Sequence, residues 1–203
     1  MVLELDNVEL YFKSKPVLNS IYLKASSGEL THILGRNGSG KSSLLRILFG
    51  DLNPKYKLIR IDGKPVNKPL FKLGIVKYLP ESPFIPANLN LRTVCNTYQV
   101  EWDEFRSYFI DFSPQPKDKF KILSTGEQRI IEAYIILKSP SKIVLLDEPF
   151  KSLSPLVVDI LKAIIAEEKK EKLIIGADHH VNHWKNISDR NYQLKDRALG
   201  LLT

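Results

Sequence analysis

Residues 31–50, THILGRNGSGKSSLLRILFG, constrain the fold of this chain more than any other stretch. The first four residues form a short apolar run that is typical of a strand. Residues 35–42 then fit the pattern G-x-x-x-x-G-K-[ST] in full. The apolar segment that follows has helical spacing, and Gly50 stands where a C-terminal cap is expected. Strand, glycine loop and helix in this order is the context that the pattern requires.

The residue types in this loop point to phosphate binding. Glycines let the backbone curl so that its N–H groups face phosphate oxygens, and the helix N-terminus adds partial positive charge. Lys41 is expected to neutralise the β- and γ-phosphates, and the Ser42 hydroxyl to ligate Mg²⁺. The predicted nucleotide-binding residues of the loop are Gly35, Arg36, Asn37, Gly38, Ser39, Gly40, Lys41, Ser42 and Ser43.

A second buried strand supplies carboxylates for the same chemistry. Residues 143–146 are four consecutive apolar residues, as in a strand of a parallel sheet with both faces covered. Asp147 and Glu148 follow at its carboxyl end, where ligands bind in open α/β sheets. We expect Asp147 to hold Mg²⁺ through water, and Glu148 to act as general base on the attacking water.

A third motif, at residues 121–140, predicts another anion contact. Ser124 and Glu127 form the S-x-x-E pattern of a helix start, and apolar residues continue with helical spacing. A well-capped helix would explain this pattern by itself. A serine hydroxyl and an unencumbered glycine, Gly126, at a helix N-terminus can also bind phosphate. One nucleotide does not need two such helices, whereas two nucleotides shared between two chains do.

Together these motifs resemble the nucleotide-binding subunit of ABC transporters, over residues 2–199. LSTGE at 123–127 is similar to that family's LSGGQ signature, residues 35–42 to its Walker A motif, and residues 143–148 to its Walker B motif. IRIDGKPV at 59–66 resembles its strand pair with an Asp-Gly turn. The resemblance implies that Phe12, or else Tyr11, stacks on adenine.

The segment GADHHVNHW at 176–184 leaves two interpretations open on its residues alone. An aspartate and three histidines are good ligands for zinc, nickel or copper, which indicates a metal-binding protein. A solvated loop after a strand is the plainer alternative. The resemblance favours a different role, in which His179 is the switch histidine that hydrogen-bonds the γ-phosphate. His180 and His183 then have no assigned role.

Three positions depart from the family pattern. Glu81 stands where a glutamine usually reaches Mg²⁺ and the attacking water, and we expect its carboxylate to ligate Mg²⁺. Ser154 replaces the aspartate of the loop that communicates between two active sites. Thr125 adds bulk beside the second phosphate contact. These changes bear on the turnover rate more than on the fold.

Composition narrows the setting. The N-terminus lacks a basic-then-apolar signal pattern, and no apolar run approaches the roughly 20 residues that span a bilayer, so we expect a cytoplasmic protein. The single cysteine, Cys95, fits a reducing compartment and excludes an internal disulfide. The net charge of +7 is spread along the chain and gives little support to a nucleic-acid partner.

The expected fold is α/β: one ABC-type cassette over residues 1–203, with a mostly parallel core sheet, an N-terminal antiparallel portion and a small helical subdomain at about 85–120. The aromatic residues of this subdomain should form its core, and a few should line a groove for the membrane partner.

The resemblance implies an ATP-hydrolysing motor that needs ATP and Mg²⁺ and drives a separate transmembrane transporter subunit. It also implies an ATP-dependent head-to-tail homodimer or pseudo-dimer, peripheral on the inner face of the cell membrane. A soluble ATPase that acts on nucleic acid or another assembly is the alternative, and the short segment between the Walker A and signature motifs argues against it because it has no room for a coiled coil.

Overall fold

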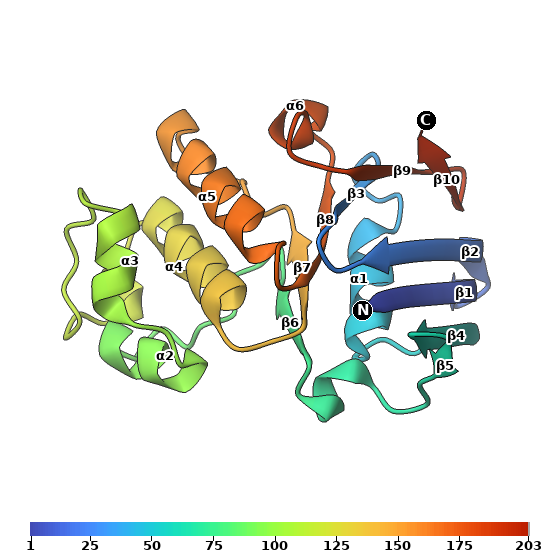
Figure 1. Ribbon diagram of the computed structural model, residues 1–203, viewed down its shortest axis with the longest axis horizontal. Helices are drawn as coiled ribbons and strands as arrows, with labels where there is room; N and C mark the ends of the chain where they lie inside the picture. The colour runs from blue at the N-terminus through green and yellow to red at the C-terminus, as the bar shows by residue number, and fades with distance from the viewer. Residues whose placement is uncertain (203) are drawn as a thin grey trace.

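A six-stranded sheet forms the centre of the computed structural model, which describes residues 1–202 (Figure 1). Its strands, in spatial order, are β10 (Ala198–Leu202), β9 (Arg190–Lys195), β3 (Leu30–Leu34), β8 (Leu173–Asp178), β7 (Ile143–Asp147) and β6 (Val76–Leu79). Only β10 runs antiparallel to its neighbour. The predicted, mostly parallel core sheet is therefore confirmed.

The two faces of this sheet build two separate hydrophobic cores. Successive residues of a strand point to opposite faces, and in β7 Val144 and Leu146 join one core while Ile143 and Leu145 join the other. All five residues of β7 are buried. Because both faces are covered, a continuous apolar run is the pattern this strand requires.

Helices α4 (Thr125–Lys138) and α5 (Pro155–Glu168) lie side by side against the first face (Figure 1). Trp184, at the end of the short helix α6 (Val181–Trp184), completes that core. Helix α1 (Lys41–Phe49) packs on the opposite face against β6, β7 and β8, and the 3-10 helix η1 (Leu70–Leu73) contacts α1 and β6.

A four-stranded antiparallel sheet covers α1 from outside. Its strands, in spatial order, are β2 (Lys15–Ser26), β1 (Val2–Phe12), β4 (Tyr56–Ile61) and β5 (Lys64–Pro65). Asp62 and Gly63 connect β4 to β5 with φ of 50° and 76°. Positive φ at both positions is the geometry of the two-residue hairpin turn that Asp-Gly favours. The predicted antiparallel portion and its turn are both present.

The small helical subdomain lies at the end of the molecule opposite the antiparallel sheet (Figure 1). It contains α2 (Leu91–Tyr98) and α3 (Trp102–Tyr108), followed by a loop and the 3-10 helix η2 (Phe120–Ile122). Phe105, Phe109 and Phe112 are buried, and the Phe105 ring lies 5.1 Å from that of Tyr134 on α4. Aromatic packing therefore joins the subdomain to α4. Its limits at 85–120 stay a prediction.

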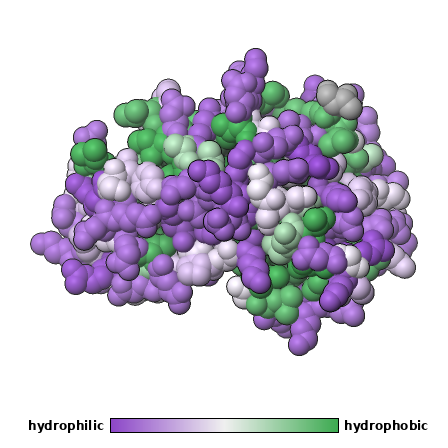
Figure 2. Space-filling model, in the orientation of Figure 1, coloured by the Kyte–Doolittle hydropathy of each residue, from purple (hydrophilic) through white to green (hydrophobic). Residues whose placement is uncertain are grey.

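Among residues 1–202, no helix is both long enough and apolar enough to cross a bilayer. In the view of Figure 2 the surface is largely hydrophilic, with separate hydrophobic patches. One patch lies at the lower edge, where Figure 1 places η1. Phe71 and Leu73 of this element are 39% and 40% exposed.

Candidate nucleotide site

Strand register brings the predicted motifs to one edge of the core sheet. Leu34, the last residue of β3, pairs with Asp178 at the end of β8, and Asp147 of β7 pairs with Ala177. The glycine loop, the Asp147–Glu148 pair and the histidine segment each follow the carboxyl end of one of these strands. Ligands bind at this edge in open α/β sheets.

The glycine loop needs its glycines for both conformation and space. Gly40 caps the N-terminus of α1 with φ of 107°, which other residues rarely adopt. A Cβ there would lie 2.9 Å from Leu18 Cδ2 on β2. A Cβ at Gly35 would lie 2.6 Å from Ser39 Oγ and 2.9 Å from the Leu194 carbonyl oxygen. The tight backbone curl therefore follows from the sequence.

A polar cavity of about 420 Å³ opens at the N-terminus of α1. It brings six of the nine loop residues together with the ring of Phe12, which is 51% exposed and accessible for stacking on a base. The residues that line the cavity are Phe12, Val17, Asn37, Gly38, Gly40, Lys41, Ser42, Ser43, Glu81 and Glu148.

Three residues of the loop face a neighbouring hollow of about 450 Å³. Gly35, Arg36 and Ser39 line it together with residues 193–196, at the end of β9 and the start of the turn to β10. The structure thus divides the nine predicted loop residues between two adjoining cavities, and the six that do not line this hollow share the polar cavity with Glu81 and Glu148.

Lys41 lines the polar cavity and is held in place by hydrogen bonds to the loop backbone. Its Nζ donates hydrogen bonds to the carbonyl oxygens of Gly35 (2.8 Å) and Arg36 (3.3 Å) and lies 3.6 Å from Glu148 Oε1. The side chain is 5% exposed. A buried ammonium needs such hydrogen-bond and charge partners. When a nucleotide binds, phosphate oxygens would replace some of these partners.

Asp147 has the free donor atom that a cation requires. The Tyr78 hydroxyl donates to its Oδ2 over 3.1 Å, whereas its buried Oδ1 has no hydrogen-bond partner among residues 1–202. Burial raises the pKa of this carboxyl, and the Ser42 hydroxyl opposes that shift. Carboxylate and hydroxyl oxygens are ligands that Mg²⁺ accepts. The residues present therefore fit the predicted magnesium ion.

Glu148 and His179 form a hydrogen-bonded pair beside this carboxyl. His179 Nδ1 lies 2.9 Å from both carboxylate oxygens of Glu148. Burial raises the pKa of Glu148, which favours a carboxyl that accepts protons readily. Its φ of 48° is strained for a residue with a side chain, and such strain concentrates at functional sites.

Arg129 is a site residue that the sequence analysis missed. Its guanidinium donates to the Pro80 carbonyl at 2.7 Å, to the Glu148 carbonyl at 2.8 Å and to the Asp147 carbonyl. It lies on α4, one turn after Ser124, and is 5% exposed. One side chain thus connects helix α4 to the backbone of Asp147 and Glu148. The sequence contained one signal for this role: an arginine directly before apolar residues 130 and 131 of the predicted helix.

Asp178 and Trp184 fix the histidine segment. Asp178 Oδ1 accepts from the backbone N–H of His180 at 2.8 Å, and its Oδ2 accepts from Trp184 Nε1 at 3.2 Å. The indole occupies the space that a side chain at Gly176 would fill, since a Cβ there would lie 1.9 Å from it. The same ring stacks on that of His32, with 4.8 Å between the ring centroids. The backbone that presents His179 is therefore rigidly anchored.

Glu81 reaches the polar cavity but already has a partner. Lys151 Nζ donates to Glu81 Oε1 over 2.7 Å, and this contact lowers the pKa of Glu81. Both side chains are about half exposed, so the pair is easily broken by a competing cation. Magnesium ligation by Glu81 stays a prediction.

Ser124 and Gly126 do not line the polar cavity of their own chain. Ser124 caps α4: its Oγ accepts from the backbone N–H of Glu127, and the Glu127 carboxylate accepts from the backbone N–H of Ser124. The predicted capping box is present. Phosphate binding by these two residues in another chain stays a prediction.

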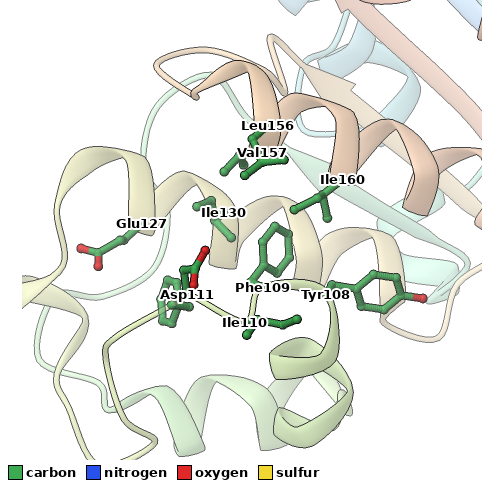
Figure 3. A pocket seen from close by; sticks show the side chains of 10 residues that line it. Tyr108, Phe109, Ile110, Asp111, Glu127, Ile130, Leu156, Val157 and Ile160 are labelled. Atoms are coloured by element: carbon green, nitrogen blue, oxygen red, sulfur yellow. The ribbon is translucent and has the colours of Figure 1, made fainter.

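A separate hollow of about 330 Å³ is mainly apolar (Figure 3). The end of α3 and the following loop, α4 and α5 supply its walls, with Phe109, Ile130 and Ile160 pointing into it. Of the described residues that line it, Asp111 and Glu127 are acidic and none is basic. Because this hollow is apolar and lacks basic residues, it does not suit a triphosphate. The polar cavity is the better site for that ligand.

Comparison with known proteins gives a consistent result. The sequence model of the family "ABC transporter" matches residues 18–151. The chain is 30% identical to the arabinose import ATP-binding protein AraG of Mannheimia succiniciproducens, over 96% of this chain and 42% of that protein. It is 25% identical to the high-affinity branched-chain amino acid transport ATP-binding protein BraG of Pseudomonas aeruginosa, over 96% of this chain and 89% of that protein. A solved ATP-binding subunit of an ABC transporter superposes with a TM-score of 0.84 at 21% identity, over 100% of this chain and 90% of that one.

Proposed function

Because this chain belongs to the ABC transporter family, we propose that it is the ATP-hydrolysing motor subunit of a transporter and drives transport through a separate membrane subunit. The observation that carries this proposal is the meeting of Lys41 and Glu148 at one polar cavity, with His179 hydrogen-bonded to Glu148. Each of these side chains has a distinct task in phosphoryl transfer to water.

The geometry supports a simple division of labour. The loop amides and Lys41 bind the β- and γ-phosphates, and the ring of Phe12 stacks on the base. Glu148 takes a proton from the attacking water, and His179 donates a hydrogen bond to the γ-phosphate. Ser42 and Asp147 would hold Mg²⁺, which supplies charge neutralisation when bound.

A groove of about 430 Å³ is suited to receive the membrane partner. It lies where η1 and β6 meet the helical subdomain, and Phe71, Phe84 and Tyr98 line it. Two further lining residues lead to the active site: Tyr78 hydrogen-bonds Asp147, and Pro80 binds Arg129 and precedes Glu81. A helix seated here would therefore contact residues that position the magnesium ligands. Such a contact supports a peripheral position of the subunit on the inner face of the membrane.

The dimer proposal rests on Ser124 and Gly126, which lie at an exposed helix start outside the cavity of their own chain. Glu148→Gln should keep ATP binding but nearly abolish turnover, because an amide does not accept the proton. The trapped ATP should then hold two chains head to tail. Light scattering of this variant should show dimers at saturating Mg-ATP. If turnover needs the membrane partner, the measurement is made with that partner present. A persistent monomer under those conditions contradicts the head-to-tail arrangement.

Purification of the native complex tests the transport role. The complex is isolated from solubilised membranes through a tag on this chain, and the co-purifying proteins are identified by mass spectrometry. A multi-helix membrane protein in stoichiometric amount is the expected result. Recovery in the soluble fraction with nucleic acid or a large assembly instead would refute the role and favour the alternative ATPase.

A further inference from the structure

Three potential metal ligands from two strand ends gather beside the nucleotide cavity. Glu148, Asp178 and His179 each offer one ligand atom, and these atoms all lie within 4.8 Å of one another. His179 Nδ1 is 2.9 Å from Glu148 Oε2 and 3.5 Å from Asp178 Oδ1. None of the three belongs to the set that fits magnesium, which is Ser42, Asp147 and the predicted Glu81.

One of these spacings fits the coordination shell of a small transition-metal ion directly. With ligand bonds of about 2.0–2.2 Å, as for zinc, neighbouring ligand atoms of a tetrahedron lie about 3.3–3.6 Å apart. The 3.5 Å separation between His179 Nδ1 and Asp178 Oδ1 lies in that range. The 2.9 Å separation between His179 and Glu148 is that of their hydrogen bond, and it would widen by a few tenths of an ångström as an ion replaces the shared proton.

The chemistry of the donors selects the metal. One imidazole nitrogen and two carboxylate oxygens suit Zn²⁺ and its neighbours, whereas Mg²⁺ prefers oxygen ligands alone and keeps several waters. Glu148 and Asp178 direct two carboxylates to one point, and a cation between them offsets their mutual repulsion. Lys41, at 3.6 Å from Glu148, is the competing cation.

The site is accessible in the nucleotide-free protein. Glu148 lines the polar cavity, and the His179 side chain is 36% exposed. Asp178 is 1% exposed and is held by Trp184 and the His180 amide, so one ligand is fixed before an ion enters. A preorganised ligand lowers the cost of binding.

We propose that Glu148, Asp178 and His179 bind a Zn²⁺-type ion in the nucleotide-free protein, and that this ion inhibits the subunit. The inhibition rests on the proposed function: an ion held here removes Glu148 as proton acceptor and His179 as donor to the γ-phosphate. Binding itself does not depend on that function.

Calorimetry with Zn²⁺ and the full chain, without nucleotide, tests the site. One ion per chain should bind, and a large molar excess of Mg²⁺ should not displace it. His179→Ala should weaken binding at least tenfold, while His180→Ala, which removes the adjacent imidazole, should leave it unchanged. Equal affinity of His179→Ala and the wild type would overturn the proposal.

X-ray absorption spectroscopy on the zinc-loaded wild type avoids any folding defect of a variant. The expected first shell holds a single imidazole nitrogen, with oxygens at about 2.0–2.2 Å. Two or more imidazoles would mean that His180 or His183 ligates the ion, which would refute the site of three ligands. Phosphate release should fall as Zn²⁺ is added and recover with a chelator. Full activity of the zinc-loaded protein would refute the inhibition, whereas inactivity of the metal-free protein would instead count against the proposed ATPase.

Discussion

Replacement of Arg129 should show how strongly one side chain supports the active-site backbone. Its guanidinium donates to three carbonyl oxygens, those of Pro80, Asp147 and Glu148, and lies 3.8 Å from the buried carboxylate of Glu132. Each hydrogen bond to a charged group contributes about 1.5–3 kcal/mol, and loss of one member of a buried pair costs about 3–5 kcal/mol. These effects overlap, so Arg129→Ala should lower the free energy of unfolding by about 3–5 kcal/mol.

Urea denaturation followed by circular dichroism measures this change. Arg129→Lys keeps the charge but lacks the planar fork, so it should recover only part of the loss. Arg92, exposed on α2, provides the control, and Arg92→Ala should stay within about 0.5 kcal/mol of the wild type. A loss of less than about 1 kcal/mol for Arg129→Ala would refute this stabilising role, because three buried carbonyl oxygens without hydrogen-bond donors should cost more than that.

Two further predictions concern pH and magnesium. Burial lowers the pKa of His32 from 6.5 to about 4, so the stability that its neutral form contributes is complete above pH 6.5 and is lost as pH falls to about 4, up to about 3 kcal/mol. His32→Phe keeps the stacking on Trp184 and should show a smaller loss of unfolding free energy over this range; equal losses would contradict it. Glu81→Gln should retain ATPase activity within severalfold, whereas Glu81→Ala should lose about tenfold or more. Superimposable magnesium titrations of the wild type and both variants would show that residue 81 does not touch the metal.

The features that sequence could predict are those encoded over a few neighbouring positions. The capping box spans Ser124 to Glu127, the hairpin turn needs only Asp62 and Gly63, and the glycine loop lies between adjacent elements. In each case local backbone geometry restricts the residue types, so the pattern is visible in the chain.

The contacts that sequence reasoning missed join distant segments. Tyr78 meets Asp147 across 69 positions, and Lys151 meets Glu81 across 70. These pairings depend on the register of β6 against β7 and on how the following loops turn, which no short pattern encodes. The contact between Glu148 and His179 also depends on strand register, because β7 and β8 are neighbours and end side by side. The roles of these residues in catalysis stay predictions.

Mg-ATP binding to purified wild type and Lys41→Ala, measured by calorimetry, tests the nucleotide site most directly. Lys41 is the buried cation of the polar cavity, and its loss should weaken binding at least tenfold, a change of about 1.4 kcal/mol or more. Lys117→Ala, at an exposed position in the loop after α3, is the matched control and should bind as the wild type does. Equal affinity of Lys41→Ala and the wild type would contradict the assignment of the glycine loop to the phosphates.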